Sequence, residues 1–235
     1  MNLDQQRRYA RQIMLPELGE AGQQKLLTAR VLVIGAGGLG SALIPYLTAA
    51  GVGTLGIIDH DRVELSNLAR QVIHESGDIG RLKVESARDR VEELTPDVRV
   101  ITYAEALTPE NAERIIAGYD VVADGCDNFA TRFVVNDACV KLGTPLVSAA
   151  IAGWQGQVMS IVPGGPTYRD FVHEDAPEAN TCRESGVIGP LAGIIGSMQA
   201  LEVLRVILGK PALGGKVAIY DGISAQQRIV HLIRG

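Results

Sequence analysis

Short apolar runs alternate with amphipathic segments from residue 30 to residue 150. The apolar runs predict strands at residues 30–34, 55–59, 98–103, 119–124 and 145–150. The segments between them predict helices at residues 39–50, 80–93, 109–117 and 129–142. Regular alternation of strand and helix is typical of a doubly wound parallel sheet. The pattern therefore predicts an α/β protein with a Rossmann-like, mostly parallel sheet.

The two ends of the chain depart from this alternation. Residues 1–28 predict two short N-terminal helices, at 3–15 and 22–27. Residues 164–186 are rich in glycine, proline and acids without periodicity, and are expected to form a mobile crossover loop. Strands are predicted on either side of that loop, and we expect them to form a C-terminal antiparallel extension of the sheet; they are residues 155–162, 216–221 and 227–233. Without a recognisable linker, residues 1–235 are predicted to form a single domain.

Residues 187–208 form a strongly apolar segment that is about long enough to cross a membrane. Gln199, Glu202 and Arg205 recur in it at three-residue spacing, which marks one polar face on an otherwise buried helix. Gly209 just past its end is a typical helix boundary. We therefore favour a core helix over a membrane span.

Composition and charge narrow the class of protein. Hydrophobic residues make up 46% of the chain and charged residues 21%, as in an ordinary globular domain. The formal net charge of −5 argues against nucleic-acid binding, and an aromatic content of 4% argues against a stacking surface for single strands. Three cysteines without paired spacing, and an N-terminus without a signal-peptide pattern, favour a cytoplasmic location.

A glycine-rich turn follows the first predicted strand, in the run Val-Leu-Val-Ile-Gly-Ala-Gly-Gly-Leu-Gly-Ser at residues 31–41. Gly35 allows a tight turn, and Gly40 lets the helix and the strand pack closely. Gly37 and Gly38 let the backbone approach a phosphate group. The helix that follows offers unpaired N–H groups to an anion.

Asp59 ends the next predicted strand, 55–59. An acid in that place can accept hydrogen bonds from ribose hydroxyls. The turn and the acid together predict a nucleotide-binding βαβ unit, but they fit ATP and NAD equally well.

Further segments combine with the glycine turn into a more specific pattern. They are Asp59-His60-Asp61, Ser66-Asn67-Leu68-Ala69-Arg70-Gln71, Gly80-Arg81-Leu82-Lys83 and Asp124-Gly125-Cys126-Asp127-Asn128. In this order and spacing the set closely resembles the MoeB/ThiF/HesA family, bacterial relatives of ubiquitin-activating enzymes. The resemblance runs from about Arg7 to Leu232, nearly the whole chain.

The resemblance implies an adenylyltransferase. In that family ATP activates the C-terminal glycine carboxylate of a ubiquitin-like, β-grasp sulfur-carrier protein ending in Gly-Gly, which gives an acyl-adenylate and pyrophosphate for molybdopterin, thiamine or related sulfur transfer. It also implies a homodimer, in which the arginine matching Arg11 crosses into the partner's site. No rhodanese-like segment follows, so an external sulfur donor is expected. The nucleotide-binding residues implied are Gly35, Gly37, Gly38, Gly40, Asp59, Asp61, Ser66, Asn67, Arg70, Gln71, Lys83, Asp127 and Asn128.

The residue types suit this reaction. A carboxylate that approaches a triphosphate is repelled by it, so positioning and cations must supply the catalysis. Arg70 and Lys83 are the cations expected to contact phosphate oxygens. Asp127 is a hard oxygen ligand expected to hold Mg²⁺. Asn67 and Gln71 can bind phosphate or ribose without adding negative charge.

Several residues near the second acidic segment have structural alternatives. Asp127 can instead cap the helix at 128–142, and Asp124 can share or take over the metal. Arg132 suits a salt bridge as well as a phosphate contact. The histidines show no ligand spacing and are expected at surface or loop positions; they are His60, His74, His173 and His231.

Cys182 matches a cysteine that some family members use covalently, as a thioester or acyl disulfide with the carrier. Arg183 beside it and a helix start downstream can lower the pKa of its thiol. The alternative is a loop cysteine without an essential role. Cys126 and Cys139 occupy predicted core positions and are expected to be inert.

The chain departs from the family at its zinc site. Thr167 and Asp170 stand where relatives carry a Cys-x-x-Cys pair, and a second pair is missing. Four-thiolate zinc needs more cysteines than the three present, so no structural zinc is expected.

Three other functions stay open. An NAD-dependent oxidoreductase would explain the glycine turn but gives no role to Arg70, Lys83 and Asp127. A non-catalytic nucleotide-binding scaffold subunit is of another class, and the intact cations count against it. A tRNA-modifying relative that activates a small carboxylate is disfavoured, because the net charge of −5 does not suit binding to RNA.

Overall fold

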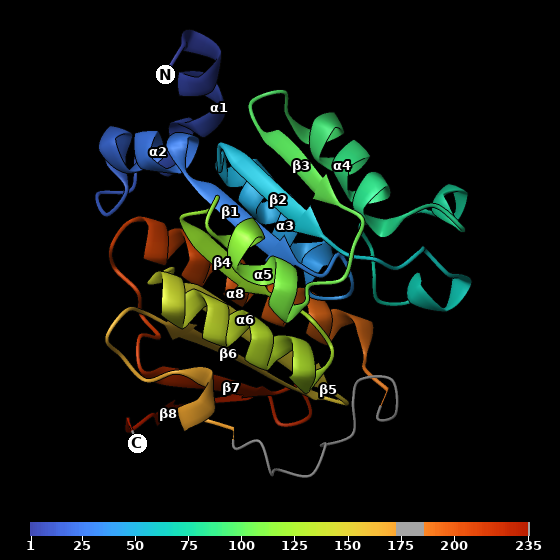
Figure 1. Cartoon of the computed structure of the whole chain (residues 1–235). Coiled ribbons are helices and arrows are strands. Elements are labelled where there is room, and N and C mark those ends of the chain that lie inside the picture. Colours follow the sequence, from blue (N-terminus) through green and yellow to red (C-terminus); the bar gives the residue numbers. More distant parts are fainter. Residues whose placement is uncertain (173–185, 235) are drawn as a thin grey trace.

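The computed structural model describes residues 1–172 and 186–234. Its centre is an eight-stranded sheet in the order β3-β2-β1-β4-β5-β6-β7-β8 (Figure 1). The first five strands of that order are parallel; in chain order they are β1 (Arg30–Ile34), β2 (Thr54–Ile58), β3 (Arg99–Tyr103), β4 (Val121–Asp124) and β5 (Leu146–Ala152). Each was predicted from the apolar runs, with ends that differ by at most two residues.

The strand order reverses between β1 and β4, which are neighbours in the sheet. β2 and β3 continue the sheet on one side of this pair, and β5 continues it on the other. In doubly wound sheets such a reversal leaves a crevice at the carboxyl ends of the strands, where ligands bind. The glycine turn after β1 and the acids after β2 and β4 all lie at this edge.

Helices cover both faces of the sheet (Figure 1). On one face lie α3 (Gly40–Ala50), α4 (Lys83–Leu94) and α8 (Gly189–Ile207), and on the other lie α5 (Pro109–Ile116) and α6 (Phe129–Leu142). Alternate residues of β1 face the two layers, with Val31 and Val33 in one apolar cluster and Leu32 and Ile34 in the other. A strand that is apolar on both faces is typical of a sheet covered on both sides.

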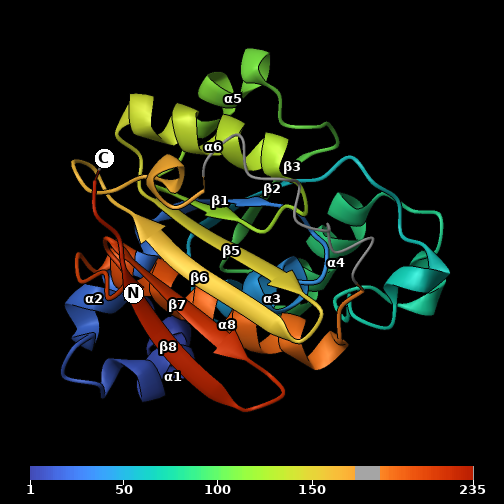
Figure 2. The same cartoon turned by 90° about the horizontal axis from the view of Figure 1, so that it is seen from below.

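The predicted antiparallel extension is confirmed and is seen from below in Figure 2. It consists of β6 (Gln155–Ile161), β7 (Lys216–Asp221) and β8 (Gln226–His231), which pair with one another and with β5 in antiparallel fashion. The predicted α/β class with a mostly parallel sheet is therefore correct.

Helix α8 has the length and apolar composition of a membrane span. In this fold it packs against α3 and the sheet, as predicted for a core helix. Two of its three polar residues point inward: the Gln199 amide donates to backbone carbonyls of β4 and β5 at 2.8 and 3.0 Å, and Glu202 accepts from Ser160 Oγ at 2.8 Å. Arg205 is exposed, as are the apolar Ile194 and Leu201.

The N-terminal helices α1 (Leu3–Ile13) and α2 (Gly19–Thr28) pack on each other and lead into the amino end of β1 (Figure 1). Tyr9 anchors α1, because its ring is fully buried and its hydroxyl donates to Asp97 Oδ2 at 3.2 Å. Helix α2 begins three residues earlier than predicted, at Gly19.

Three single-turn 3-10 helices have no counterpart in the sequence prediction. They are η1 (Leu65–Asn67), η2 (Ser76–Asp78) and η3 (Tyr168–Asp170). The last side chain of each accepts a hydrogen bond from the N–H of the residue before the turn, at 2.7 to 3.2 Å. A three-residue turn is too short to show periodicity, so the hydrophobic pattern misses it. Most of the predicted crossover loop, residues 173–185, lies outside the described residues, and its mobility stays a prediction.

Candidate active site

The turn between β1 and α3 needs glycine at two places. Gly35 adopts φ +92°, a left-handed conformation that residues with a Cβ rarely adopt. Gly40 starts α3 directly against the turn, and a Cβ there would lie 2.4 Å from the carbonyl oxygen of Gly35. The predicted roles of these two glycines, a tight turn and close helix packing, thus have a physical basis in the fold.

The same turn presents backbone donors. Within residues 1–172 and 186–234, the N–H groups of Gly37, Gly38 and Leu39 have no hydrogen-bond partner. They precede the 11-residue helix α3, whose dipole adds partial positive charge at this end. Unpaired N–H groups at a helix N-terminus suit a phosphate group.

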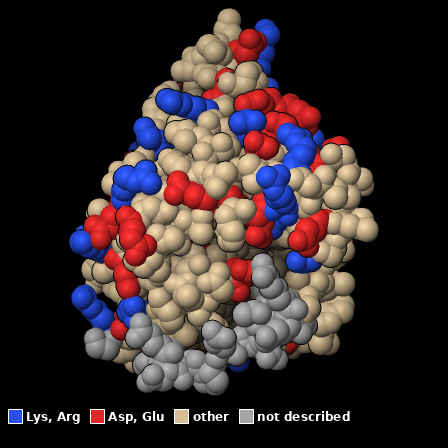
Figure 3. Space-filling view, turned by 45° about the vertical axis from the view of Figure 1, so that its right-hand side comes forward, with Lys and Arg blue, Asp and Glu red and all other residues tan. Residues whose placement is uncertain are grey.

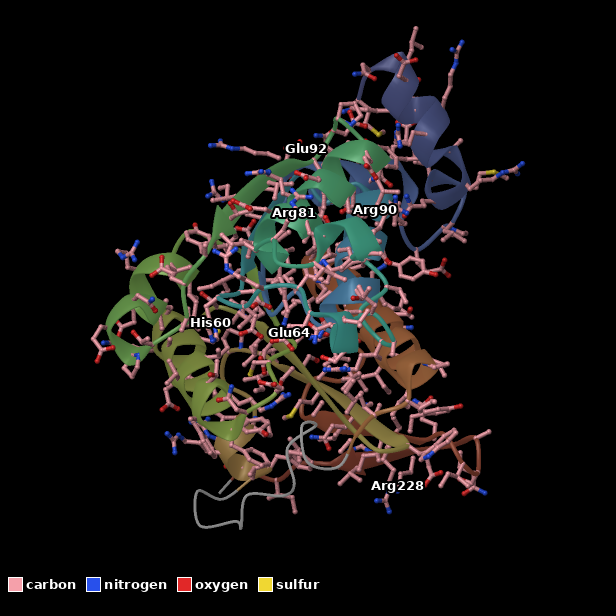
Figure 4. All side chains as sticks on the ribbon, turned by 90° about the vertical axis from the view of Figure 1, so that its right-hand side faces the viewer. His60, Glu64, Arg81, Arg90, Glu92 and Arg228 are labelled. Carbon is pink, nitrogen blue, oxygen red and sulfur yellow. The ribbon has the colours of Figure 1, made fainter. Side chains whose placement is uncertain are left out.

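A pocket opens over this turn at the carboxyl edge of the sheet. Gly37, Gly38 and Leu39 line it from the turn between β1 and α3, and Arg70, Gln71 and Lys83 line it from the segment after β2. His60 lies beside it on an exposed loop (Figure 4). On the face shown in Figure 3, acidic and basic side chains are interspersed. The predicted binding residues on the pocket wall are Gly35, Gly37, Gly38, Asp59, Asp61, Arg70, Gln71, Lys83, Asp127 and Asn128.

Asp59 supports the turn from the end of β2. Its Oδ2 accepts from the N–H of Ala36 at 2.8 Å, and its Oδ1 accepts from the N–H of Asp61 at 2.8 Å. Each oxygen keeps a second lone pair for a ribose hydroxyl. Asp59, His60 and Asp61 also bring ligand atoms within 4.8 Å of one another. Because these carboxylates already hold backbone and lysine groups, the cluster is better explained as loop structure than as a metal site.

The two predicted cations differ in their surroundings. Lys83 is buried, and its Nζ lies 2.8 Å from Asp61 Oδ2. Arg70 is half-buried, and among the described residues its guanidinium donates to the Ser66 carbonyl at 3.1 Å and forms no ion pair with a carboxylate. Arg70 therefore brings an uncompensated positive charge to the pocket, whereas the charge of Lys83 is balanced by Asp61.

The two acids at and after the end of β4, Asp124 and Asp127, have different surroundings. Asp124 is 1% exposed, and its Oδ2 lies 3.1 Å from Arg132 Nη1 in a buried ion pair. Arg132 thus forms the salt bridge that was one of its two expected roles. Asp127 is exposed and lines the pocket. The cap of α6 is Asn128, whose Oδ1 accepts from the N–H of Thr131 at 2.8 Å, so the alternative in which Asp127 caps this helix is wrong.

Gln71 carries a buried polar atom without a partner. Its side chain is 4% exposed, and its Oε1 has no hydrogen-bond partner among the described residues. A buried amide oxygen in that state costs stability unless a ligand or water donates to it. The pocket wall at Gln71 therefore fits a bound molecule with a hydrogen-bond donor.

Four predicted site residues do not line the pocket. Gly40 lies beneath it, and Asn67 closes η1 by accepting from the N–H of Glu64 at 3.2 Å. Ser66 is exposed. Arg11 is exposed on α1, at the amino ends of the strands. Cys182 lies outside the described residues.

The other cysteines and histidines are placed as follows. Burial raises the pKa of the Cys126 thiol well above its usual range, and that of Cys139 to about 12, which agrees with inert thiols. His60 and His231 are exposed, and His173 lies outside the described residues. His74 is in a loop, as expected, but it is buried, at 5% exposure.

A hydrogen-bonded turn occupies the position of the missing cysteine pair. Thr167 donates to Asp170 Oδ2 from its N–H at 2.7 Å and from its hydroxyl at 3.0 Å. Between them Tyr168 is 2% exposed and meets the rings of Phe133 and Phe171 edge-on. This turn and its aromatic contacts join the segment to α6 without a metal ligand pair.

Sequence reasoning missed several pocket residues. Glu105 and Leu107 come from the loop after β3, and Ile151 and Val187 come from β5 and the segment before α8. The loop after β3 was detectable, because every parallel strand of the sheet ends at this edge. Val187 could not be predicted as a pocket residue, because it is placed there by a β-bridge to Gly153, and local sequence does not indicate that pairing.

Comparison with known proteins identifies relatives over nearly the full length of the chain. Residues 9–234 match the model of the ThiF family. The chain is 46% identical over 239 residues to "Adenylyltransferase and sulfurtransferase MOCS3" of Sus scrofa, and 45% identical over 233 residues to the protein of the same name in Dictyostelium discoideum. These alignments cover 100% and 97% of this chain but 52% and 55% of the relatives, so the chain spans about half their length.

Solved structures share the fold at lower identity. E. coli MccB with ATP matches with a TM-score of 0.86 and 20% identity, over 100% of this chain and 72% of that chain. PaaA matches with a TM-score of 0.84 and 22% identity, over 100% of this chain and 76% of that chain. At such low identity these likenesses concern the fold alone. The family model and the closer relatives decide membership: this chain belongs to the ThiF family.

Proposed function

We propose that this chain is an ATP-dependent adenylyltransferase that activates the C-terminal carboxylate of a ubiquitin-like sulfur-carrier protein ending in Gly-Gly. Its family and the name of its MOCS3 relatives support this class of reaction. One observation of the structure carries the proposal. The pocket combines unpartnered N–H groups of the glycine turn with the guanidinium of Arg70, which no described carboxylate neutralises. A polyanion is the ligand that suits such a wall.

The reaction is a displacement at the α-phosphorus of ATP. A carboxylate oxygen of the carrier forms a bond to that phosphorus, while the bond to the bridging oxygen of the β-phosphate breaks. The products are the acyl-adenylate and pyrophosphate, and no oxidant or proton donor is required. Arg70 and the turn N–H groups hold phosphate oxygens, and Lys83 can exchange Asp61 for a phosphate oxygen. Asp59 and Gln71 have acceptors for ribose hydroxyls.

Asp127 is the residue that we propose to hold Mg²⁺. It is exposed at the pocket, whereas the neighbouring Asp124 is buried in an ion pair with Arg132. A carboxylate is a preferred ligand of Mg²⁺, and the ion supplies charge neutralisation on the phosphates when bound. Asp124 is a poor alternative ligand, because freeing it would break a buried ion pair.

The finer assignments are also proposals. The carrier is of the type that serves molybdopterin or thiamine synthesis, and sulfur comes from a separate donor. Arg11 lies away from the pocket of its own subunit, so its proposed role requires a homodimer in which it enters the site of the second copy. The proposed location is the cytoplasm.

Mass spectrometry tests the proposal directly. The chain is incubated with Mg²⁺, ATP and a candidate carrier ending in Gly-Gly, and the expected product is the carrier with added AMP. Calorimetry with ATP and with NAD, each with Mg²⁺, is run in parallel. Binding of NAD without binding of ATP would refute the proposal, as would intact carrier with every candidate tested.

Replacing Arg70 by alanine is expected to lower kcat of ATP–pyrophosphate exchange by about two to three orders of magnitude, because a transition-state donor is lost. Stability should change by less than about 0.5 kcal/mol, since no buried partner is left behind. Arg90→Ala is the matched control, because Arg90 is exposed on α4, does not line the pocket and lies away from the pocket residue His60 in Figure 4. Equal activity of the two variants would remove Arg70 from the mechanism.

Replacing Lys83 by methionine is expected to cost about 2–4 kcal/mol of transition-state stabilisation. Methionine keeps the length of the buried stem, and Asp61, whose side chain is 35% exposed, can regain water. The free energy of unfolding should therefore fall by no more than about 1 kcal/mol. Exchange kinetics and urea unfolding measure the two effects separately; a large loss of stability with normal kcat would assign Lys83 a purely structural role.

A further inference from the structure

His74 lies beneath the glycine turn, behind the wall of the pocket. It belongs to the loop between η1 and η2 and is only 5% exposed. Its Nε2 is 2.9 Å from the carbonyl oxygen of Ala36, which is the second residue of the turn. A carbonyl oxygen can only accept, so Nε2 must carry a proton in this contact.

The second ring nitrogen contacts a hydroxyl that a carboxylate holds. Nδ1 lies 2.8 Å from the hydroxyl of Ser86 on α4, and this hydroxyl donates to Asp78 Oδ2 in η2 at 2.7 Å. Burial lowers the pKa of His74, although the charges of Asp78 and Asp59 oppose this and that of Lys83 adds to it. The single proton of the Ser86 hydroxyl is donated to Asp78, so Ser86 does not fix the tautomer of the ring. The contact that requires a proton on Nε2 is the one with the Ala36 carbonyl.

Ala36 is thereby held on both sides. Its N–H donates to Asp59 Oδ2 at 2.8 Å, and its carbonyl accepts from His74. The peptide between Ala36 and Gly37 is trans, so its N–H points opposite to its C=O. With the Ala36 carbonyl held beneath the turn, the N–H of Gly37 is directed to the other side, and Gly37 lines the pocket there.

We propose that His74 is a positioning residue for phosphate recognition, which holds the Ala36 carbonyl so that the Gly37 N–H faces a phosphate of the bound nucleotide. The proposal rests on the ATP-binding function proposed above and extends it to a residue that does not touch the ligand. Glycines at 35, 37 and 38 leave the turn free to rotate its peptides, so an external hydrogen bond is needed to select one orientation.

Two variants at this position distinguish the effect of the hydrogen bond to Ala36 from the effect of losing the imidazole ring. In His74→Gln the side-chain amide can donate from near the place of Nε2, whereas His74→Asn is one methylene shorter and cannot reach Ala36. Asparagine is expected to raise both KM for ATP and the calorimetric Kd of ATP by roughly threefold to tenfold, the worth of one hydrogen bond. Its kcat should stay within about twofold of the parent, and glutamine should restore KM. His231→Asn is the matched control, because His231 is exposed on β8.

A second readout does not depend on activity. Nitrogen-15 shifts of the imidazole should show a proton on Nε2. Amide hydrogen exchange at residues 35–40 should be faster in His74→Asn and unchanged in His74→Gln. If His74→Asn fails to fold, the nitrogen-15 shifts of the parent chain still test whether Nε2 donates to the Ala36 carbonyl.

The proposal is overturned if Nε2 carries no proton, or if glutamine and asparagine behave alike in hydrogen exchange and in KM. A chain that binds no ATP and catalyses no exchange would refute the proposed function instead. In that case the protonation of Nε2 and the exchange rates still decide whether His74 holds the turn.

Discussion

Replacing Asp127 by asparagine is expected to slow ATP–pyrophosphate exchange by about a thousandfold, on the order of 4 kcal/mol. Asparagine keeps the shape of the side chain but removes the charge that the proposed Mg²⁺ ligand needs. The fold should be unaffected, since Asp127 is exposed and the cap of α6 is supplied by Asn128. The loss should therefore be one of metal affinity and rate.

Metal dependence distinguishes this role from a general weakening of the site. The concentration of Mg²⁺ needed for half-maximal exchange should rise in Asp127→Asn, and Mn²⁺ binding in the presence of ATP, followed by electron paramagnetic resonance, should weaken. Asp137→Asn is the matched control, because Asp137 is an exposed acid on α6 that pairs with a surface arginine. Unchanged Mg²⁺ dependence in the Asp127 variant would contradict the proposed ligand role, whatever its rate.

The regular part of the fold was predictable because its signals are local. Buried parallel strands are continuous apolar runs, and β1 was located to the residue because Val31 to Ile34 face two covered layers. Helix α6 was likewise exact, since Asn128 caps it at one end and Gly143 ends it in the left-handed conformation. The order of strands in the sheet was not predicted, because the alternation of elements indicates a parallel sheet but does not say which strands are neighbours.

The site was less predictable where a residue acts through distant partners. His74 had no informative neighbours in sequence, and its contacts come from Ala36 and from Ser86 on α4. The polar residues of α8 were recognised, but periodicity does not say which face meets the sheet, and Gln199 proved to bond with β4 and β5. The pairing of Lys83 with Asp61 was also hidden, because both residues were assigned to the ligand.

The loop that carries Asp127 depends on a buried charge pair. The Arg132 guanidinium donates to Asp124 and to Ser148 Oγ, each at 3.1 Å, and also to the carbonyl of Cys126. Asp124 Oδ1 accepts from the N–H of Cys126 at 3.0 Å, so the loop is tied to both members of the pair. One arginine thus links the end of β4, β5 and the loop that carries the proposed metal ligand.

Replacing Arg132 by methionine is therefore expected to lower the free energy of unfolding by about 3–5 kcal/mol. Asp124, at 1% exposure, would be left as a buried carboxylate without its counter-ion, and the desolvation of that charge would no longer be offset. Urea unfolding measures this change in the free energy of unfolding. Arg169→Met is the matched control, because Arg169 pairs with Asp137 at the surface and should cost no more than about 1 kcal/mol.

A second substitution tests the cause of that instability. Asp124→Asn in the Arg132→Met background removes the stranded charge, and its one amide oxygen can still accept from the N–H of Cys126, so most of the lost stability should return. The amide nitrogen then faces the Ser148 hydroxyl, whose oxygen can accept from it. If the double variant is no more stable than Arg132→Met, packing of the arginine stem is responsible and the charge pair is not. Because the same guanidinium holds the Cys126 carbonyl, the double variant should still exchange pyrophosphate more slowly than the parent even when fully folded. Stability and catalysis would then be separated at one residue, with the charge of Arg132 supporting the fold and its hydrogen bond to the loop supporting the placement of Asp127.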